Sequence, residues 1–200
     1  MSFDFKKDPL DNFLELYKQS QIRGVPDANA MSLATVNSEN QTSVRVVLFK
    51  GLIEKDDSRG FSFYTNYQGR KARDIEYNNK ISANFFWPQL DEQIRIQGVA
   101  EKISRSASEN YFSTRPRVSQ IGAWASHQSE QIESFEAFTA EFKKIENKFS
   151  GKTIPCPPHW GGYCIIPTEI EFWFGKIGRL HERYVYQKTS DGWNKFLRSP

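Results

Sequence analysis

The densest group of chemically capable side chains lies near the carboxyl end of the sequence, at residues 169–188. Arg179, His181 and Arg183 are each separated by one residue, so all three share one face if this segment is extended. Two guanidinium groups beside an imidazole suit a planar or anionic ligand, because arginine offers a rigid fork of donors and also stacks on rings. The alternative interpretation is a stripe of hydrated charges at a sheet edge.

A second group of cations flanks the apolar segment RVVLFK, which Arg45 begins and Lys50 ends. Burial of either cation would require an anionic partner. Their separation is odd, so on a regular strand they would face opposite sides. Either Lys50 lies beyond the strand, helped by Gly51, or a bulge lies between the two cations. Two hydrated strand ends would also explain the pattern.

The segment YTNYQGRK places Tyr64, Thr65, Gly69, Arg70 and Lys71 where a predicted strand leads into a predicted helix. A helix amino terminus offers free N–H groups, and here a hydroxyl and two cations lie beside it. Such an arrangement is a natural cradle for a phosphate. A helix cap with exposed charges is the alternative.

A phenol, a guanidinium and a hydroxyl follow at steps of four residues, in Tyr111, Arg115 and Ser119. The first two would share a helix face, and Pro116 would break the helix so that Ser119 could turn toward them. This trio predicts a second anion site. We interpret Arg117 as a structural or surface cation.

These groups need a scaffold, and short β-branched or aromatic segments separated by polar turns predict an antiparallel meander. The segment 93–102 alternates most clearly, with Ile94 and Ile96 opposite Arg95 and Gln97. Several short strands at regular spacing indicate a sandwich or barrel. The expected strands are residues 31–36, 44–50, 61–64, 81–87 and 93–102, with polar turns at 38–40 and 56–60.

Helices are expected around this sheet. Asp8 as a cap and Pro9 at the first helical position predict a helix that ends at residues 24–26. Helical periodicity also occurs at residues 70–78, 107–114 and 132–149. In the last of these, phenylalanines recur at steps of three or four, which predicts a stripe packed in the core or against another subunit. The fold class is therefore mainly β with peripheral helices.

The bulk properties narrow the classes of function. The chain of 200 residues and 23.2 kDa fits one domain, and its net charge of +3 comes from dispersed cations, so no nucleic-acid tract is indicated. Cys156 and Cys164 have no metal-type spacing, so we interpret both as free thiols and expect no metal site. No signal peptide and no membrane-spanning run is recognised, which predicts a cytoplasmic protein without a membrane partner.

The motif E-F-W-x5-R-L-H-E-R resembles the carboxyl-terminal motif of the pyridoxine (pyridoxamine) 5'-phosphate oxidases, which are FMN enzymes of vitamin B6 metabolism. The resemblance extends over roughly residues 30–200. Three features depart from the family pattern. Phe174 replaces the usual Gln, His or Gly, Leu197 precedes Arg198 where the family has the reverse order, and an Arg-x-x-Tyr element is missing near the amino terminus. The resembling positions are Glu171, Phe172, Trp173, Arg179, Leu180, His181, Glu182 and Arg183.

The resemblance implies one FMN-binding split β-barrel over residues 1–200, antiparallel and Greek-key-like. Residues 1–26 would form an amino-terminal helical segment and residues 150–200 the region of the oxidase motif. The family binds FMN between two subunits, so a homodimer with FMN at its interface is implied.

The resemblance also assigns roles. Amides of Gln93 and Gln128 match the donor and acceptor edge of a flavin, although they would otherwise be read as surface glutamines. The implied substrate contacts are Lys50, Tyr111, Arg115, Ser119, Arg179 and His181, of which Arg179 and His181 are the candidates for catalysis. The implied FMN contacts are Arg45, Lys50, Tyr64, Thr65, Arg70, Lys71, Gln93, Gln128, Ser129, Trp173 and Arg183.

The expected activity is the oxidation of pyridoxine or pyridoxamine 5'-phosphate by O2, which yields pyridoxal 5'-phosphate and H2O2. One alternative is a related FMN oxidase of another pathway, such as the phenazine-biosynthesis branch. Another is a non-catalytic barrel that stores flavin or binds single-stranded nucleic acid through aromatics among cations.

Overall fold

The computed structural model describes residues 3–55 and 58–200. Within these residues, nine strands form one sheet in which neighbouring strands are antiparallel. The strands are β1 (Ala30–Val36), β2 (Thr42–Leu48), β3 (Leu52–Lys55), β4 (Ser58–Asn66), β5 (Lys80–Trp87), β6 (Glu92–Lys102), β7 (Trp160–Phe174), β8 (Glu182–Thr189) and β9 (Gly192–Leu197).

The sheet closes into a barrel, which confirms the predicted class. Its strand order is β2-β1-β5-β6-β7-β4-β3, and the two strands at the ends of this order follow each other in the chain. Only residues 49–51 separate them. The Lys50 N–H donates to the Ser62 carbonyl over 2.9 Å, and the Ser62 N–H donates to the Gly51 carbonyl over 3.0 Å. These bonds remove the open edge that would otherwise lie between β2 and β4.

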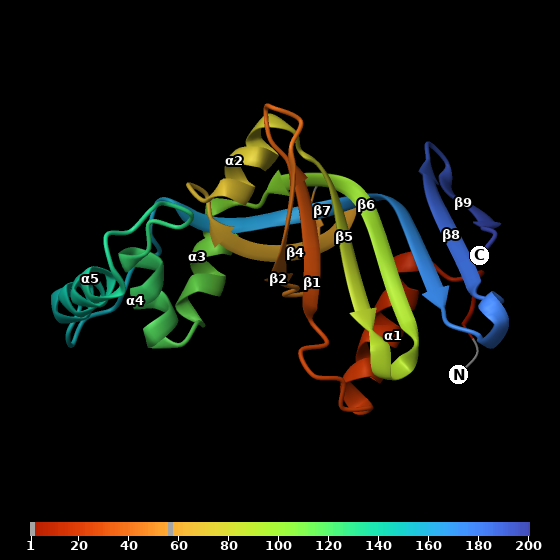
Figure 1. The fold of residues 1–200 in the computed structure, drawn as a ribbon, viewed down its shortest axis with the longest axis horizontal. Coiled ribbons are helices and arrows are strands. Elements are labelled where there is room, and N and C mark those ends of the chain that lie inside the picture. Colours follow the sequence, from red (N-terminus) through yellow and green to blue (C-terminus); the bar gives the residue numbers. More distant parts are fainter. Residues whose placement is uncertain (1–2, 56–57) are drawn as a thin grey trace.

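Strand β7 connects two distant parts of the molecule. Residues 160–165 pair with β4, and residues 169–174 pair with β8. Figure 1 shows helices α3, α4 and α5 at one end of β7, whereas β8 and β9 lie at the other end. The sequence alternation of Ile170, Phe172 and Phe174 with Glu171 and Trp173 predicts a half-buried strand, and the structure places these residues at the end of β7.

The helices largely follow the predicted periodicity. They are α1 (Pro9–Ile22), α2 (Arg70–Tyr77), α3 (Arg105–Ser113), α4 (Arg117–Ala125) and α5 (Phe135–Lys148). Two short 3-10 turns are η1 (Pro88–Leu90) and η2 (Ile177–Arg179). Helix α1 begins as expected: the Asp8 side chain accepts from the Leu10 N–H over 2.9 Å, and Pro9 occupies the first turn. Helix α4 and strand β3 were not predicted.

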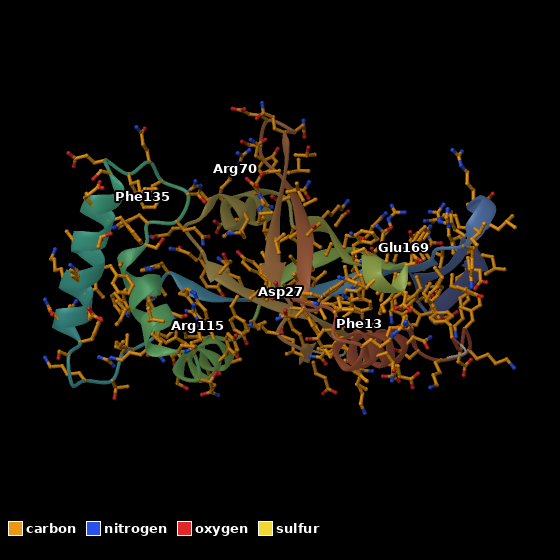
Figure 2. The ribbon with its side chains drawn as sticks, turned by 60° about the horizontal axis from the view of Figure 1, so that its bottom comes forward. Phe13, Asp27, Arg70, Arg115, Phe135 and Glu169 are labelled. Atoms are coloured by element: carbon orange, nitrogen blue, oxygen red, sulfur yellow. The ribbon has the colours of Figure 1, made fainter. Side chains whose placement is uncertain are left out.

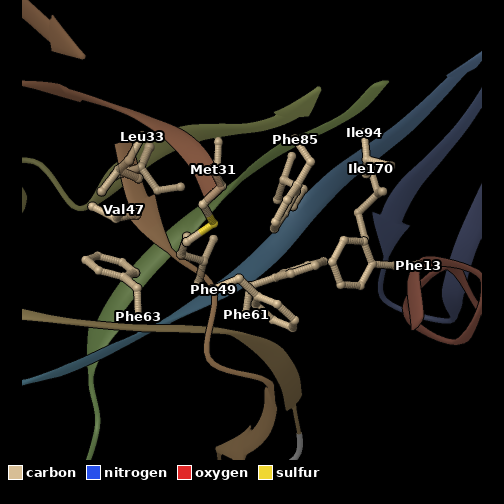
Figure 3. Close-up of a cluster of buried hydrophobic side chains, with 14 of the residues drawn as sticks. Phe13, Met31, Leu33, Val47, Phe49, Phe61, Phe63, Phe85, Ile94 and Ile170 are labelled. Carbon is tan, nitrogen blue, oxygen red and sulfur yellow. The ribbon is translucent and has the colours of Figure 1, made fainter. Parts of the chain in front are cut away.

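The main hydrophobic core lies between α1 and the barrel strands, as Figure 3 shows. The Phe13 ring of α1 makes edge contacts with Phe49 at 5.2 Å and Phe61 at 4.8 Å, and a tilted contact with Phe85 at 5.0 Å. All four rings are buried. Each such ring contributes roughly 2–3 kcal/mol of burial free energy, so this cluster fixes α1 against the barrel.

A second, smaller core fills the helical end of the molecule. It consists of Phe112, Ile121, Ala125, Ile145, Phe149, Ile154 and Trp160. The predicted phenylalanine stripe is only partly core: Ile145 and Phe149 are buried, but Phe135, at the start of α5, is 76% exposed. The predicted polar turn at 56–60 is wrong at its end, because Ser58–Gly60 already belong to β4, whereas Asp56 and Asp57 lie outside the described residues.

Candidate active site

A cavity of about 710 Å³ lies between strands β2 and β4 and helices α2, α3 and α4. Among the described residues that line it, four are cations and none is a carboxylate: Arg45, Lys50, Lys71 and Arg115. A concave site with this charge attracts anions and has the size of a small-molecule site. Tyr64, Thr65, Tyr111, Ser119 and Gln128 also line it, so nine of the predicted contacts surround one cavity.

One wall of the cavity is a polar cluster around Lys71. Its ammonium donates to the Thr65 hydroxyl over 3.1 Å and to Gln128 Oε1 over 2.6 Å. Burial, with Arg45 nearby, lowers the pKa of Lys71. A Cβ atom at Gly69 would meet Gln128 Oε1 at 2.4 Å, so a larger residue there would displace this amide oxygen from Lys71. An anion at this wall would favour the charged form of Lys71, so the cluster suits a phosphate.

Arg45 extends this wall and has the anionic partner that burial was expected to require. Its Nη2 lies 3.7 Å from Asp74 Oδ2, and its Nη1 donates to Thr35 Oγ1 over 2.7 Å. Thr35 in turn donates to the buried Asp74 over 2.6 Å. Burial lowers the pKa of Arg45, although Asp74 opposes this effect. Asp74 and Thr35 therefore hold the Arg45 guanidinium on the side away from the cavity, while its other side borders the cavity.

The position of Lys50 decides between the alternatives left open by the sequence. Strand β2 ends at Leu48, so Lys50 lies beyond the strand, and Gly51 has a φ of 124° that favours glycine. No bulge is needed. Both Lys50 and Arg45 can then line the same cavity.

The second predicted anion site lies across the cavity, at the junction of α3 and α4. Tyr111 is in α3, Arg115 follows the helix, and Pro116 caps α4, whose first turn holds Ser119. Tyr111 and Arg115 therefore do not share one continuous helix as predicted, because α3 ends at Ser113. Arg115 lines the cavity, and its buried Nη1 has no hydrogen-bond partner among the described residues. Figure 2 shows Arg115 at the helical end.

Arg70 and Ser129 lie beside the cavity rather than in its lining. The Arg70 N–H donates to Ser129 Oγ over 3.1 Å at the start of α2. Ser129 has a φ of 71°, which is uncommon for a serine. The contact ties the loop after α4 to the amino terminus of α2. As predicted, Arg117 is structural, since it donates to the carbonyl oxygens of Lys152 and Phe149.

The remaining predicted contacts form a separate group at the other end of β7. Gln93, Trp173 and Arg183 are neighbours across strands β6, β7 and β8. The Trp173 and His181 rings lie 4.7 Å apart, and the Lys176 N–H donates to His181 Nδ1 over 3.1 Å. Since Nδ1 accepts, a neutral His181 ring carries its proton on Nε2.

The predicted extended row of Arg179, His181 and Arg183 is wrong. Residues 177–179 form the turn η2, and β8 begins only at Glu182. Gly178 and Arg179 have φ values of 73° and 62°, which reverse the chain before the strand. Arg179 is exposed in this turn, whereas Arg183 is in the strand and half-buried.

The two groups cannot meet within one chain. Thr65 pairs with Gly161 near the beginning of β7, and Trp173 lies twelve residues further along the same strand. At about 3.3 Å per residue, the two groups lie roughly 40 Å apart along the strand. Figure 2 agrees, with Arg115 and Glu169 toward opposite ends of the molecule.

Three neighbours of the predicted contacts were given no role from the sequence: Asp74 behind Arg45, Glu171 beside Arg183, and Trp160 in the cavity wall. Glu171 was noted only as part of the motif. A signal existed for Trp160, because two glycines follow it and predict close packing. Nothing local singles out Asp74 from the other acids of the chain.

Membrane-spanning helices and metal-binding clusters are both absent from the described part of the chain. None of its helices is long and apolar enough to cross a membrane. Residues 3–55 and 58–200 also contain no group of three His, Cys, Asp or Glu side chains that could hold a metal ion. Cys156 and Cys164 are free thiols, as predicted.

Family models match most of the sequence. The model described as "Pyridoxamine 5'-phosphate oxidase" matches residues 19–149. The model described as "Pyridoxine 5'-phosphate oxidase C-terminal dimerisation region" matches residues 160–200. The second region begins with β7 and contains the group around Trp173 and Arg183.

Similar proteins agree with these matches. The chain is 52% identical over 199 residues to a pyridoxine/pyridoxamine 5'-phosphate oxidase of Bdellovibrio bacteriovorus, covering 99% of this chain and 100% of that protein. It is also 44% identical over 193 residues to a pyridoxine/pyridoxamine 5'-phosphate oxidase of Rubrobacter xylanophilus. This match covers 96% of this chain and 87% of that protein.

Solved structures support the fold. PhzG of Burkholderia lata, in complex with tetrahydrophenazine-1-carboxylic acid, matches with a TM-score of 0.92 at 27% identity, covering 100% of this chain and 98% of that one. An FMN-binding protein related to pyridoxamine 5'-phosphate oxidase, from Nostoc punctiforme, matches in fold with a TM-score of 0.77 at 16% identity, covering 98% and 100%. The protein described here belongs to the pyridoxine/pyridoxamine 5'-phosphate oxidase family.

Proposed function

We propose that this protein oxidises pyridoxine or pyridoxamine 5'-phosphate to pyridoxal 5'-phosphate, with FMN as its cofactor and O2 as the final acceptor, which becomes H2O2. The observation that carries the proposal is the cavity with four cations and no carboxylate among its described lining residues. Two phosphates, one from the cofactor and one from the substrate, carry negative charge that these cations can neutralise. The full-length likeness to oxidases of this name supports the same substrate.

FMN fits the wall around Lys71. The ammonium of Lys71, the Thr65 hydroxyl and the Arg45 guanidinium would hold its phosphate, with Tyr64, Lys50, Arg70, Gln128 and Ser129 as further contacts. Their donors are already oriented by bonds to one another and to Asp74, so little ordering is required on binding. When bound, FMN supplies the acceptor for the two electrons that leave C4' of the substrate.

The substrate phosphate fits the opposite wall. Arg115, with a buried and unpartnered Nη1, would donate to its oxygens together with the Tyr111 and Ser119 hydroxyl groups. Lys50 lies in the same lining and would contact both ligands. Burial lowers the pKa of Arg115, and an anion would offset this desolvation.

We infer that a second copy of the chain completes each site. Gln93, Trp173 and Arg183 would contact FMN, and Arg179 and His181 would contact the substrate ring, all from the partner chain. The separation of roughly 40 Å along β7 supports this arrangement. Val44 and Val46 of β2 are 67% and 62% exposed, so an apolar strip beside the cavity is available for an interface.

Within that composite site, Arg179 and His181 would orient the substrate and ease the loss of its proton. The proton on His181 Nε2 can be donated to an acceptor on the substrate ring, because Nδ1 is engaged by the Lys176 N–H. Arg179 lies on an exposed turn and can reach a neighbouring molecule. The Trp173 ring lies 4.7 Å from the His181 ring and would exclude water from one side.

The test is to mix FMN-loaded protein with pyridoxine 5'-phosphate in the absence of O2 and to follow the visible flavin band. Bleaching that reverses when air enters is the expected result. An unchanged band with the B6 phosphates, together with bleaching by tetrahydrophenazine-1-carboxylic acid, would assign the protein to the phenazine branch. A band that no substrate changes would indicate a flavin carrier.

A further inference from the structure

Trp160, the first residue of β7, forms part of a stack of aromatic rings in the cavity wall. Its ring lies 5.3 Å from that of Tyr64 with an interplanar angle of 11°, and Tyr64 lies 4.0 Å from Tyr111 at 19°. The three rings are therefore nearly parallel. Trp160 is only 5% exposed, so its ring is a fixed surface rather than a mobile one.

The Arg115 guanidinium lies against this ring. Its Cζ atom is 4.7 Å from the centre of the Trp160 ring and 5.6 Å from that of Phe112. In the part of the chain that the structure describes, no carboxylate pairs with Arg115, and Nη1 has no hydrogen-bond partner. Ring contacts are thus the interactions that orient this guanidinium.

The backbone around Trp160 is held by another arginine. Arg105 Nη1 donates to the carbonyl oxygens of Pro157 and Trp160 over 2.9 and 3.0 Å, and Nη2 donates to that of Cys156 over 2.6 Å. The Phe112 ring packs on the indole edge at 5.1 Å and 70°. The indole plane is fixed by these contacts before any ligand binds.

We propose that Trp160 is a positioning residue for the substrate phosphate, because its indole face holds the unpaired Arg115 guanidinium in the wall of the cavity. The inference rests on the proposed function, in which Arg115 binds that phosphate. Without the indole face, Arg115 gains rotamer freedom, and ordering it on binding costs affinity for the phosphate. The chemistry at C4' is not affected, since Trp160 does not act on the reacting atoms.

The test compares Trp160→Leu and Trp160→Phe with the parent enzyme, all saturated with FMN, under steady-state turnover of pyridoxine 5'-phosphate. Trp160→Leu should raise KM about tenfold and leave kcat within about twofold, as expected for the loss of a buried cation–π contact. Trp160→Phe keeps a weaker π face and should raise KM about threefold. Trp124→Leu is the matched control, because Trp124 binds the same loop through the Pro155 carbonyl but does not line the cavity.

The outcomes separate the two proposals. An unchanged KM in Trp160→Leu, or an equal rise in Trp124→Leu, would refute the positioning role while Arg115→Ala still raised KM. An unchanged KM in Arg115→Ala would instead refute the proposed phosphate site. If Trp160→Leu does not fold, Trp160→Phe decides alone: a KM equal to that of the parent overturns the inference.

Discussion

Arg183 binds the buried carboxylate of Glu171 through two nitrogens: Nε donates to Oε1 over 2.9 Å and Nη2 donates to Oε2 over 3.0 Å. Glu171 also accepts from Arg198 over 2.6 Å and lies 3.3 Å from Arg95. Arg183 Nη1 donates to the Ser199 carbonyl. Three guanidinium groups therefore surround one carboxylate, and this carboxylate fixes the orientation of the proposed FMN contact.

Glu171→Gln should weaken FMN binding about tenfold and lower the free energy of unfolding by about 3 kcal/mol, because three cations would lose a partner that is 1% exposed. Fluorescence titration of FMN and urea unfolding measure the two effects. Glu141→Gln is the control: its surface pair with Lys144 is worth less than about 1 kcal/mol. Equal FMN affinity in Glu171→Gln and the parent would show that Arg183 is not held for the cofactor.

Arg45→Ala should weaken FMN retention and also destabilise the apoprotein, because the buried Asp74 loses its cation. The double variant Arg45→Gln, Asp74→Asn separates the two effects. It removes the buried charge, so it should recover stability in urea unfolding but not FMN affinity. Recovery of both would mean that Arg45 only supports the fold.

The sequence could predict those parts of the site whose residues lie close together in the chain. Thr65 and Lys71 lie where a strand end meets a helix start, and this pattern is readable over a few residues. The partners of Arg45 and Arg183 were not readable, since Asp74 and Glu171 reach them through packing and register between separate elements. The row of Arg179, His181 and Arg183 was predicted wrongly because a positive φ at an arginine has no sequence signal.

The structure explains two departures from the family pattern, Phe174 and the order of Leu197 and Arg198. Phe174 packs against Phe3 at 5.3 Å and Tyr184 at 6.0 Å, so it belongs to an aromatic cluster that ties the amino-terminal segment to β8. Arg198 binds Glu169 and Glu171, whereas Leu197 is 68% exposed. Arg198 follows β9 directly, and its N–H donates to the Arg183 carbonyl over 3.0 Å, which holds this cation beside the buried carboxylate.

Arg179→Ala should leave the protein yellow but reduce kcat/KM for pyridoxine 5'-phosphate by about tenfold or more, because a substrate contact is lost and FMN contacts are retained. Flavin absorbance after gel filtration and oxygen consumption measure the two properties. Lys176→Ala removes a cation from the same connection and is the control. If Arg179→Ala lost FMN but kept full turnover per bound flavin, Arg179 would be a contact of FMN and not of the substrate.

Glu92→Gln should stabilise the protein at neutral pH. Burial raises the pKa of Glu92, partly opposed by Arg23, and its Oε2 has no hydrogen-bond partner among the described residues. A raised carboxyl pKa means that stability falls as the pH rises from about 4.3, the unfolded value, through the folded value. The stability advantage of Glu92→Gln in urea unfolding should therefore shrink as the pH is lowered toward 4. An advantage independent of pH would indicate a packing effect.

Mixing two defective variants should restore activity if each site uses both chains. Arg115→Ala and Arg179→Ala impair the two residue groups that lie at opposite ends of β7. In a mixed dimer, one composite site would carry both substitutions and the other neither, since the two-fold interface pairs opposite groups. Random exchange would make about half of the dimers mixed, so activity should recover to about a quarter of the parent value. Unfolding and refolding the variants together with FMN, with each refolded alone as the control, tests this. A mixture no more active than the average of the two alone would place both groups in sites of a single chain.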